Sequence, residues 1–98
     1  MGSRGRTTTD HEDIRRWAEA RGGRPMAIRG AGEDDAEAIR LVFPDAPPPD
    51  AADLEPISWD EWFRRFDEHD LALLMEELTS DGRQSRFNKL VRSTLVGR

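Results

Sequence analysis

The basic residues near the end of the chain are the first group whose types and spacing could do chemistry. They surround one aromatic residue, and no acidic residue occurs from position 82 to 98. Arginine and lysine pair with phosphates, and an aromatic ring among them can stack on a base, so the pattern is typical of single-strand nucleic-acid binding. The candidates for contact with nucleic acid or another partner are Arg83, Arg86, Phe87, Lys89 and Arg92.

Neighbouring carboxylates form a second group. They occur at Asp60-Glu61, Asp67-Glu68 and Glu76-Glu77. Such pairs could supply the acid and the base of a small hydrolase if one carboxyl group were buried and its pKa raised. Acidic pairs are more often surface groups, so the hydrolase is the second alternative function.

The remaining polar residues do not form a known catalytic or metal-binding motif. His11 and His69 have no second His or Cys at zinc-ligand spacing, and Ser58 and Ser85 have no neighbouring His to activate them. The glycines at 30 and 32 match neither the dinucleotide-binding nor the P-loop fingerprint. The sequence therefore predicts no catalytic residue, no metal site and no cofactor.

Charge is distributed unevenly along the chain, which has a net charge of −5. Residues 33–81 hold sixteen acids against three bases, whereas the two flanks together hold four acids against twelve bases. A bipolar chain is suited to docking on a charged partner. We therefore expect a non-enzymatic accessory or protein-interaction module with an unknown protein partner, and nucleic-acid binding is the first alternative.

Composition indicates where such a module would act. The chain has no cysteine, which favours a reducing compartment, and we expect the cytoplasm. Its longest apolar run, residues 71–75, is too short to cross a bilayer, so no membrane association is expected. The oligomeric state is left open.

Local signals in the first half predict a helix followed by a hairpin. A capping box at Thr9 opens a helix over residues 10–21, which the glycines at 22 and 23 end. Short strands follow at 26–29 and 38–43, and they are expected to pair antiparallel. The proline-rich segment 44–56 is expected to be an extended loop.

The second half begins with the strongest local signal in the chain. Ser58 and Glu61 form a capping box for a helix over residues 59–69. An aromatic stripe at helical spacing is expected to face the core. It consists of Trp59, Trp62, Phe63 and Phe66. A strand is expected within 71–78, whereas residues 84–95 fit either a strand or a helix.

These elements predict one α+β domain, because 98 residues are too few for two independent cores. The expected order is α-β-β-α-β followed by a strand or a helix. The expected architecture is an antiparallel sheet of three or four strands with two helices on one face. Residues 9–92 form this domain, residues 1–8 are expected to be a flexible arm, and residues 93–98 a flexible tail.

Several segments resemble a family of small uncharacterised bacterial proteins. They read TTTDHEDIRRWAE (7–19), RGGRP (21–25), ISWDEWF (57–63), LALL (71–74) and SRFNKLV (85–91). The resemblance spans most of residues 7–92, departs at the loop 44–56 and after Arg92, and implies the architecture but no active-site residues. Some members are labelled glucan branching enzyme, yet such enzymes resemble (β/α)₈ barrels of about 250 residues, which this chain cannot build.

Overall fold

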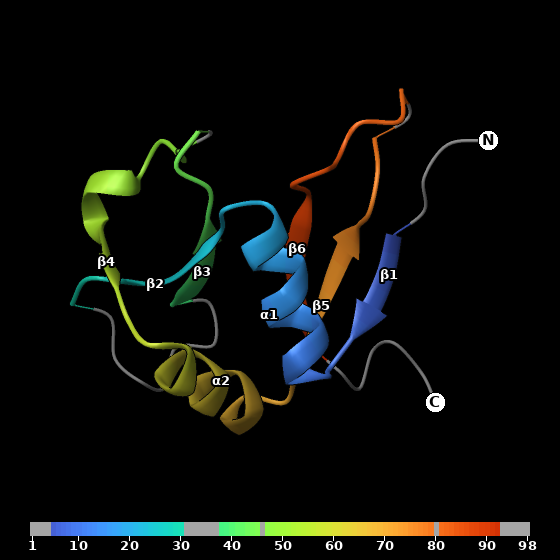
Figure 1. Ribbon diagram of the computed structural model, residues 1–98. Coiled ribbons are helices and arrows are strands. Elements are labelled where there is room, and N and C mark those ends of the chain that lie inside the picture. The colour runs from blue at the N-terminus through green and yellow to red at the C-terminus, as the bar shows by residue number, and fades with distance from the viewer. Residues whose placement is uncertain (1–4, 31–37, 46, 80, 93–98) are drawn as a thin grey trace.

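The computed structural model describes residues 5–30, 38–45, 47–79 and 81–92 (Figure 1). Its first helix, α1 (His11–Ala20), is capped by Asp10 and not by the predicted Thr9. The Asp10 carboxylate accepts hydrogen bonds from the N–H groups of Glu12 and Asp13, which would otherwise be unpaired in the first turn. A carboxylate one residue later therefore replaces the threonine hydroxyl.

Helix α1 ends where the glycine pair predicts. Gly22 has a φ of 74°, a conformation that glycine adopts without strain, and Gly23 N donates to Ala18 O at 2.8 Å. Gly23 also lies against a ring, because a Cβ placed there would come within 2.7 Å of Phe43 Cε1. The predicted apolar face of the helix, Ile14, Trp17 and Ala18, is buried.

Helix α2 (Trp59–Glu68) confirms half of its capping box. The Ser58 hydroxyl accepts a hydrogen bond from Glu61 N at 3.0 Å. The Glu61 carboxylate accepts hydrogen bonds from Arg64 and Arg65 instead of returning to the cap. The aromatic stripe is core, as predicted: Trp62, Phe63 and Phe66 are buried, and Trp59 packs against them half-buried.

One antiparallel sheet has the strand order β3-β2-β4. Strands β2 (Arg24–Ile28) and β3 (Ile39–Val42) form the predicted hairpin. The segment expected to be a loop returns through a short 3₁₀ turn (Ala51–Asp53) as β4 (Leu54–Pro56), which pairs with β2. This strand forms because Leu54 is buried in the core side of the sheet while the proline that ends it lies at the edge.

The other antiparallel sheet has the order β1-β5-β6. Strand β5 (Leu71–Glu76) lies at its centre and β6 (Asn88–Arg92) at one edge, so the ambiguous segment near the end contains a strand. Residues 5–8 belong to the segment expected to be a flexible arm, but they form β1 (Gly5–Thr8) on the other side of β5. Arg6 explains the difference, since it pairs with both Asp13 and Glu77.

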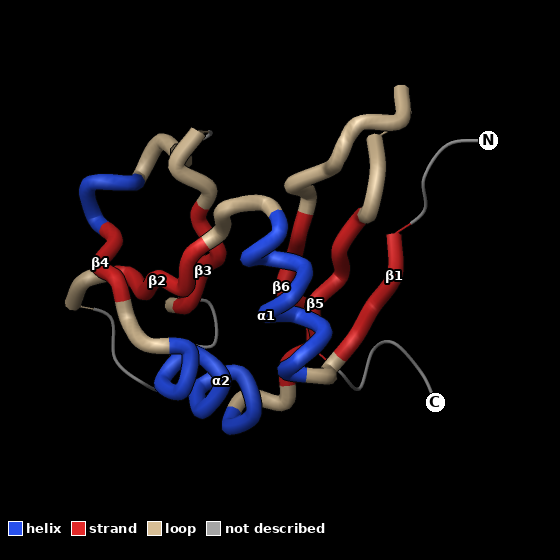
Figure 2. The backbone as a smooth tube through the Cα atoms, in the orientation of Figure 1, coloured by secondary structure: helices blue, strands red, loops and turns tan. Residues whose placement is uncertain are grey.

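The α+β class is confirmed, with two three-stranded sheets where one sheet was expected (Figure 2). Strands β2 and β5 cannot pair, because β3 and β4 occupy both sides of β2 while β1 and β6 occupy both sides of β5. Helix α2 contacts β2, β3 and β5, so it packs against both sheets instead of covering one face of a single sheet. One core joins α1, α2, β3 and β5, and the radius of gyration of 13.3 Å is that of one domain.

Candidate interaction surface

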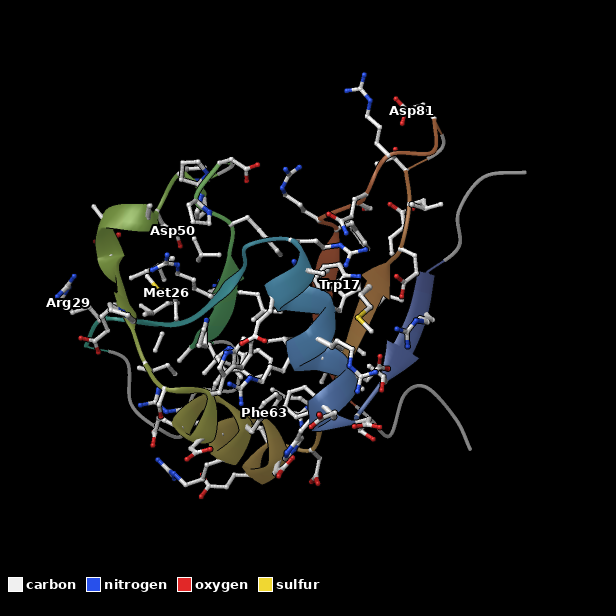
Figure 3. All side chains as sticks on the ribbon, viewed as in Figure 1. Trp17, Met26, Arg29, Asp50, Phe63 and Asp81 are labelled. Atoms are coloured by element: carbon white, nitrogen blue, oxygen red, sulfur yellow. The ribbon has the colours of Figure 1, made fainter. Side chains whose placement is uncertain are left out.

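The predicted basic residues do not form one patch. Arg83 lies on the connection between β5 and β6, near its tip at Asp81 (Figure 3), and the two side chains are 3.7 Å apart. Arg86 pairs with Asp45, which follows β3. Two of the five candidates are therefore already paired with acids of this chain.

The other three candidates lie on or beside β6. Phe87 O accepts a hydrogen bond from Glu76 N at 3.2 Å, so Phe87 continues the line of the strand and shares one face with Lys89. Arg92 is three positions from Lys89 and projects from the opposite face. Phe87 is 53% exposed. The structure thus brings Phe87 and Lys89 together and separates them from the other cations.

A buried arginine fixes the connection between β5 and β6 to the end of α1. The Arg21 side chain is 5% exposed and donates to the carbonyl oxygens of Trp17, Ser85 and Glu77. Its guanidinium carbon also lies 4.3 Å from the centre of the Trp17 ring. Burial lowers the pKa of Arg21, although an arginine remains charged. The role of Arg21 was not predicted from the sequence, in which its one signal is its position four residues after Trp17.

A second arginine, Arg6, lines a cleft of about 450 Å³ between α1, β1 and the end of β5. Arg6 donates to both carboxylate oxygens of Asp13, at 2.6 and 2.9 Å, and to Glu77 at 2.9 Å. The hydrogen bond from Arg6 lowers the pKa of Asp13. A carboxyl group that stays ionised cannot act as a general acid near neutral pH. Arg6 therefore forms a junction that connects β1 with α1 and with the end of β5.

Acidification should weaken this junction. Because Arg6 lowers the folded-state pKa of Asp13, the pair stabilises the protein above the ordinary Asp pKa of 3.8, and this stabilisation is lost as pH falls below it. We expect Asp13→Asn to lower the free energy of unfolding by about 0.5–1 kcal/mol at pH 7. Urea titrations should show the difference from wild type shrinking towards pH 2, whereas the exposed control Glu19→Gln should show little effect at either pH. A difference independent of pH would contradict the assignment.

The carboxylate pairs proposed for hydrolysis are engaged in structural contacts. Hydrogen bonds from Arg64 and then Arg65 lower the pKa of Glu61, the opposite of what a general acid requires. Glu76 accepts a hydrogen bond from the Ser85 hydroxyl at 2.7 Å. The Asp67 carboxylate lies 2.8 Å from His11 Nε2.

His11 joins the two helices. Its ring stacks on Phe63 with 4.2 Å between ring centres and 11° between planes, and Nε2 reaches Asp67 on the same helix, α2. The His11 side chain is 45% exposed and packs on Phe63 with one side of its ring. His69 ends α2, and its N–H donates to Arg65 O.

A groove of about 350 Å³ lies between β3, α2 and β6. Strands β3 and β6 are edge strands of different sheets, so the groove is bordered by two sheet edges. The apolar residues that line it are Ile39, Leu41, Trp62 and Leu90. Arg40, Asn88 and Lys89 complete the lining. Of these lining residues, only Lys89 could be proposed from the sequence as a contact residue, because a site formed between two sheets has no local pattern.

No family model, curated protein or solved structure matches the chain. Within the described residues, no three His, Cys, Asp or Glu side chains are grouped so that they could hold a metal ion. No helix in the described ranges is long and apolar enough to cross a membrane. The groove between β3 and β6 and the charges beside it are the features of the described residues that indicate a function.

Proposed function

We propose that the chain is a non-enzymatic protein-interaction module that binds a protein partner through the groove between β3 and β6. The observation that carries this proposal is a partly apolar groove between two sheet edges with which no further described strand pairs. Lys89 lines this groove, and Arg92 lies further along the same strand. Lys89 and Arg92 form no ion pair or side-chain hydrogen bond with any described residue. By contrast, Arg6, Arg21 and Arg86 are each paired within the chain.

The chemistry of the other candidate sites supports the same proposal. The lowered pKa values of Asp13 and Glu61 fit structural ion pairs better than acid-base catalysis. The absence of cysteine favours a reducing compartment, so the proposed partner is a protein of the cytoplasm.

Nucleic-acid binding is the alternative, and one observation favours it. Phe87 is exposed on the same face as Lys89, and an aromatic ring beside a cation can stack on a base. Such binding would use the whole basic edge and would weaken steeply with salt. Protein binding in the groove would depend on Lys89 and Arg92 but not on Arg83 and Arg86.

Two matched charge reversals separate these functions. Affinity capture from a lysate of the source organism, with and without nuclease, would compare wild type, Lys89→Glu/Arg92→Glu and the control Arg83→Glu/Arg86→Glu. We expect protein partners that survive nuclease, are retained by the control and are lost with the first double variant. Nuclease-sensitive recovery that both double variants abolish would favour the nucleic-acid alternative. Equal capture by all three proteins would contradict a role for the groove.

A further inference from the structure

The main-chain groups of β6 define what its open edge can bind. Along an antiparallel strand, residues alternately direct their main-chain groups towards and away from the neighbouring strand. The hydrogen bond from Glu76 N to Phe87 O shows that Phe87 directs its main-chain groups towards β5. Lys89 and Val91 therefore turn their N–H and C=O groups towards β5, while Asn88, Leu90 and Arg92 turn theirs outward. No described strand pairs with this outward side. The edge thus offers donors and acceptors at alternating positions to another strand.

The facing edge of β3 is less suited to accept a strand. Ile28 N donates to Ala38 O, so the main chain of Ile39 turns away from β2 and towards the open side. The Ile39 carbonyl already accepts a hydrogen bond from Arg40 Nη1 at 3.1 Å. One acceptor at the start of this short edge is therefore occupied, and β6 is the better template.

Side chains around β6 determine which residues an added strand would carry. A residue opposite Leu90 would point into the groove, between Ile39, Leu41 and Trp62, and would have to be apolar. Residues opposite Lys89 and Arg92 would face cations that have no acidic partner among the described residues, and would favour Asp or Glu. Opposite Val91, a β-branched residue would pack best.

We propose that an extended acidic peptide segment of the partner adds to β6 as a fourth strand of the sheet β1-β5-β6. Its residues opposite Lys89, Leu90, Val91 and Arg92 are an acid, an apolar residue, a β-branched residue and an acid. They occur in this order in a parallel strand and in the reverse order in an antiparallel strand. This inference rests on the proposed function and names its ligand. A second copy of the chain is disfavoured as the occupant, because lysine on an edge strand opposes pairing with another such edge.

A random peptide library displayed against the immobilised full chain tests the recognition sequence. We expect enriched peptides to carry two acids three positions apart with apolar residues between them. Their affinity should fall about tenfold or more in Lys89→Glu/Arg92→Glu and stay unchanged in Arg83→Glu/Arg86→Glu. Both pairs are exposed, and circular dichroism would verify that each variant is folded. Selected peptides that are basic or proline-rich would overturn the proposal. So would selected peptides that bind Lys89→Glu/Arg92→Glu as well as they bind wild type.

Amide exchange tests the mode of binding with the best selected peptide. Strand addition should protect the amides of Asn88 and Leu90, and methylation of the peptide's backbone nitrogens should abolish binding. A peptide could require Lys89 and Arg92 for binding and yet leave the amides of Asn88 and Leu90 unprotected. This result would overturn strand addition but would not contradict the proposed protein-interaction function. If Lys89→Glu/Arg92→Glu still captured the protein partners from the lysate, the proposed function itself would be overturned. Concentration-dependent dimers that the same variant abolishes would point to a second copy and also overturn the proposal.

Discussion

Replacing Trp62 with alanine is expected to lower the free energy of unfolding by about 3–5 kcal/mol. The side chain is fully buried, and its ring centre lies 5.2 Å from that of Phe63 and 5.3 Å from that of Phe66. Its Nε1 donates to Arg40 O at 3.0 Å, so the same residue joins α2 to β3. Because domains have total stabilities of about 5–15 kcal/mol, much of this variant should be unfolded at 37 °C.

Urea denaturation followed by circular dichroism measures this loss. Trp59→Ala, in the same helix but half-buried, is the matched control and should cost less than half as much. Trp62→Phe keeps most of the volume and removes the hydrogen bond to Arg40, so it should lie between the two. A Trp62→Ala variant as stable as Trp59→Ala would contradict the central position of this ring in the core.

Replacing Arg21 with alanine is expected to lower the free energy of unfolding by about 2–4 kcal/mol. The substitution removes donors from three carbonyl groups, and an acceptor left unpaired in a buried position costs about 1–3 kcal/mol. It also removes the contact between the guanidinium and the Trp17 ring. The connection between β5 and β6 would lose its attachment to α1, so local opening should precede global unfolding.

Two measurements separate the local effect from the global one. Hydrogen exchange at the Ser85 and Phe87 amides should accelerate more than exchange at the Leu73 amide in the central strand. Arg21→Lys should be nearly as destabilised as Arg21→Ala, because an ammonium group cannot reproduce the fork that reaches three carbonyls. Arg15→Ala, on the exposed side of α1, is the control and should cost at most about 0.5 kcal/mol. If Arg21→Ala lost no more stability than Arg15→Ala, Arg21 would not attach the connection between β5 and β6 to α1.

The helices could be predicted because their signals are local. The Ser58 cap and the aromatic spacing from Trp59 to Phe66 lie within one segment, and both are realised in α2. The hairpin of β2 and β3 follows from the same kind of evidence, since Ile39, Leu41 and Phe43 alternate and are all buried. The shift of the first cap from Thr9 to Asp10 is within the ordinary uncertainty of helix ends.

The two missed strands have no such local signal. Residues 5–8 read Gly-Arg-Thr-Thr, and they become β1 through pairing with β5 and through the contacts of Arg6. Strand β4 lies in a proline-rich segment and pairs over three residues with β2. These are also the strands that complete the two sheets, so missing them led directly to the expectation of a single sheet.

The candidate site was predicted in part for the same reason. Charge along the chain identified Lys89 and Arg92, but it could not show that Arg83 and Arg86 are paired with Asp81 and Asp45. The groove itself depends on β3 and β6 belonging to different sheets, which no periodicity records. Sequence therefore located the cations, and tertiary structure determined which of them remain available.

The position of β1 also has a consequence for how the chain folds. Arg6 on β1 and its partner Glu77, just after β5, are 71 residues apart, so the sheet β1-β5-β6 closes only after nearly the whole chain has been brought together. Contacts this distant in sequence slow the search for the native state, so we expect slower folding than that of a helical bundle of equal length, which needs about microseconds to milliseconds. During synthesis, β1 would leave the ribosome long before the strand that it pairs with.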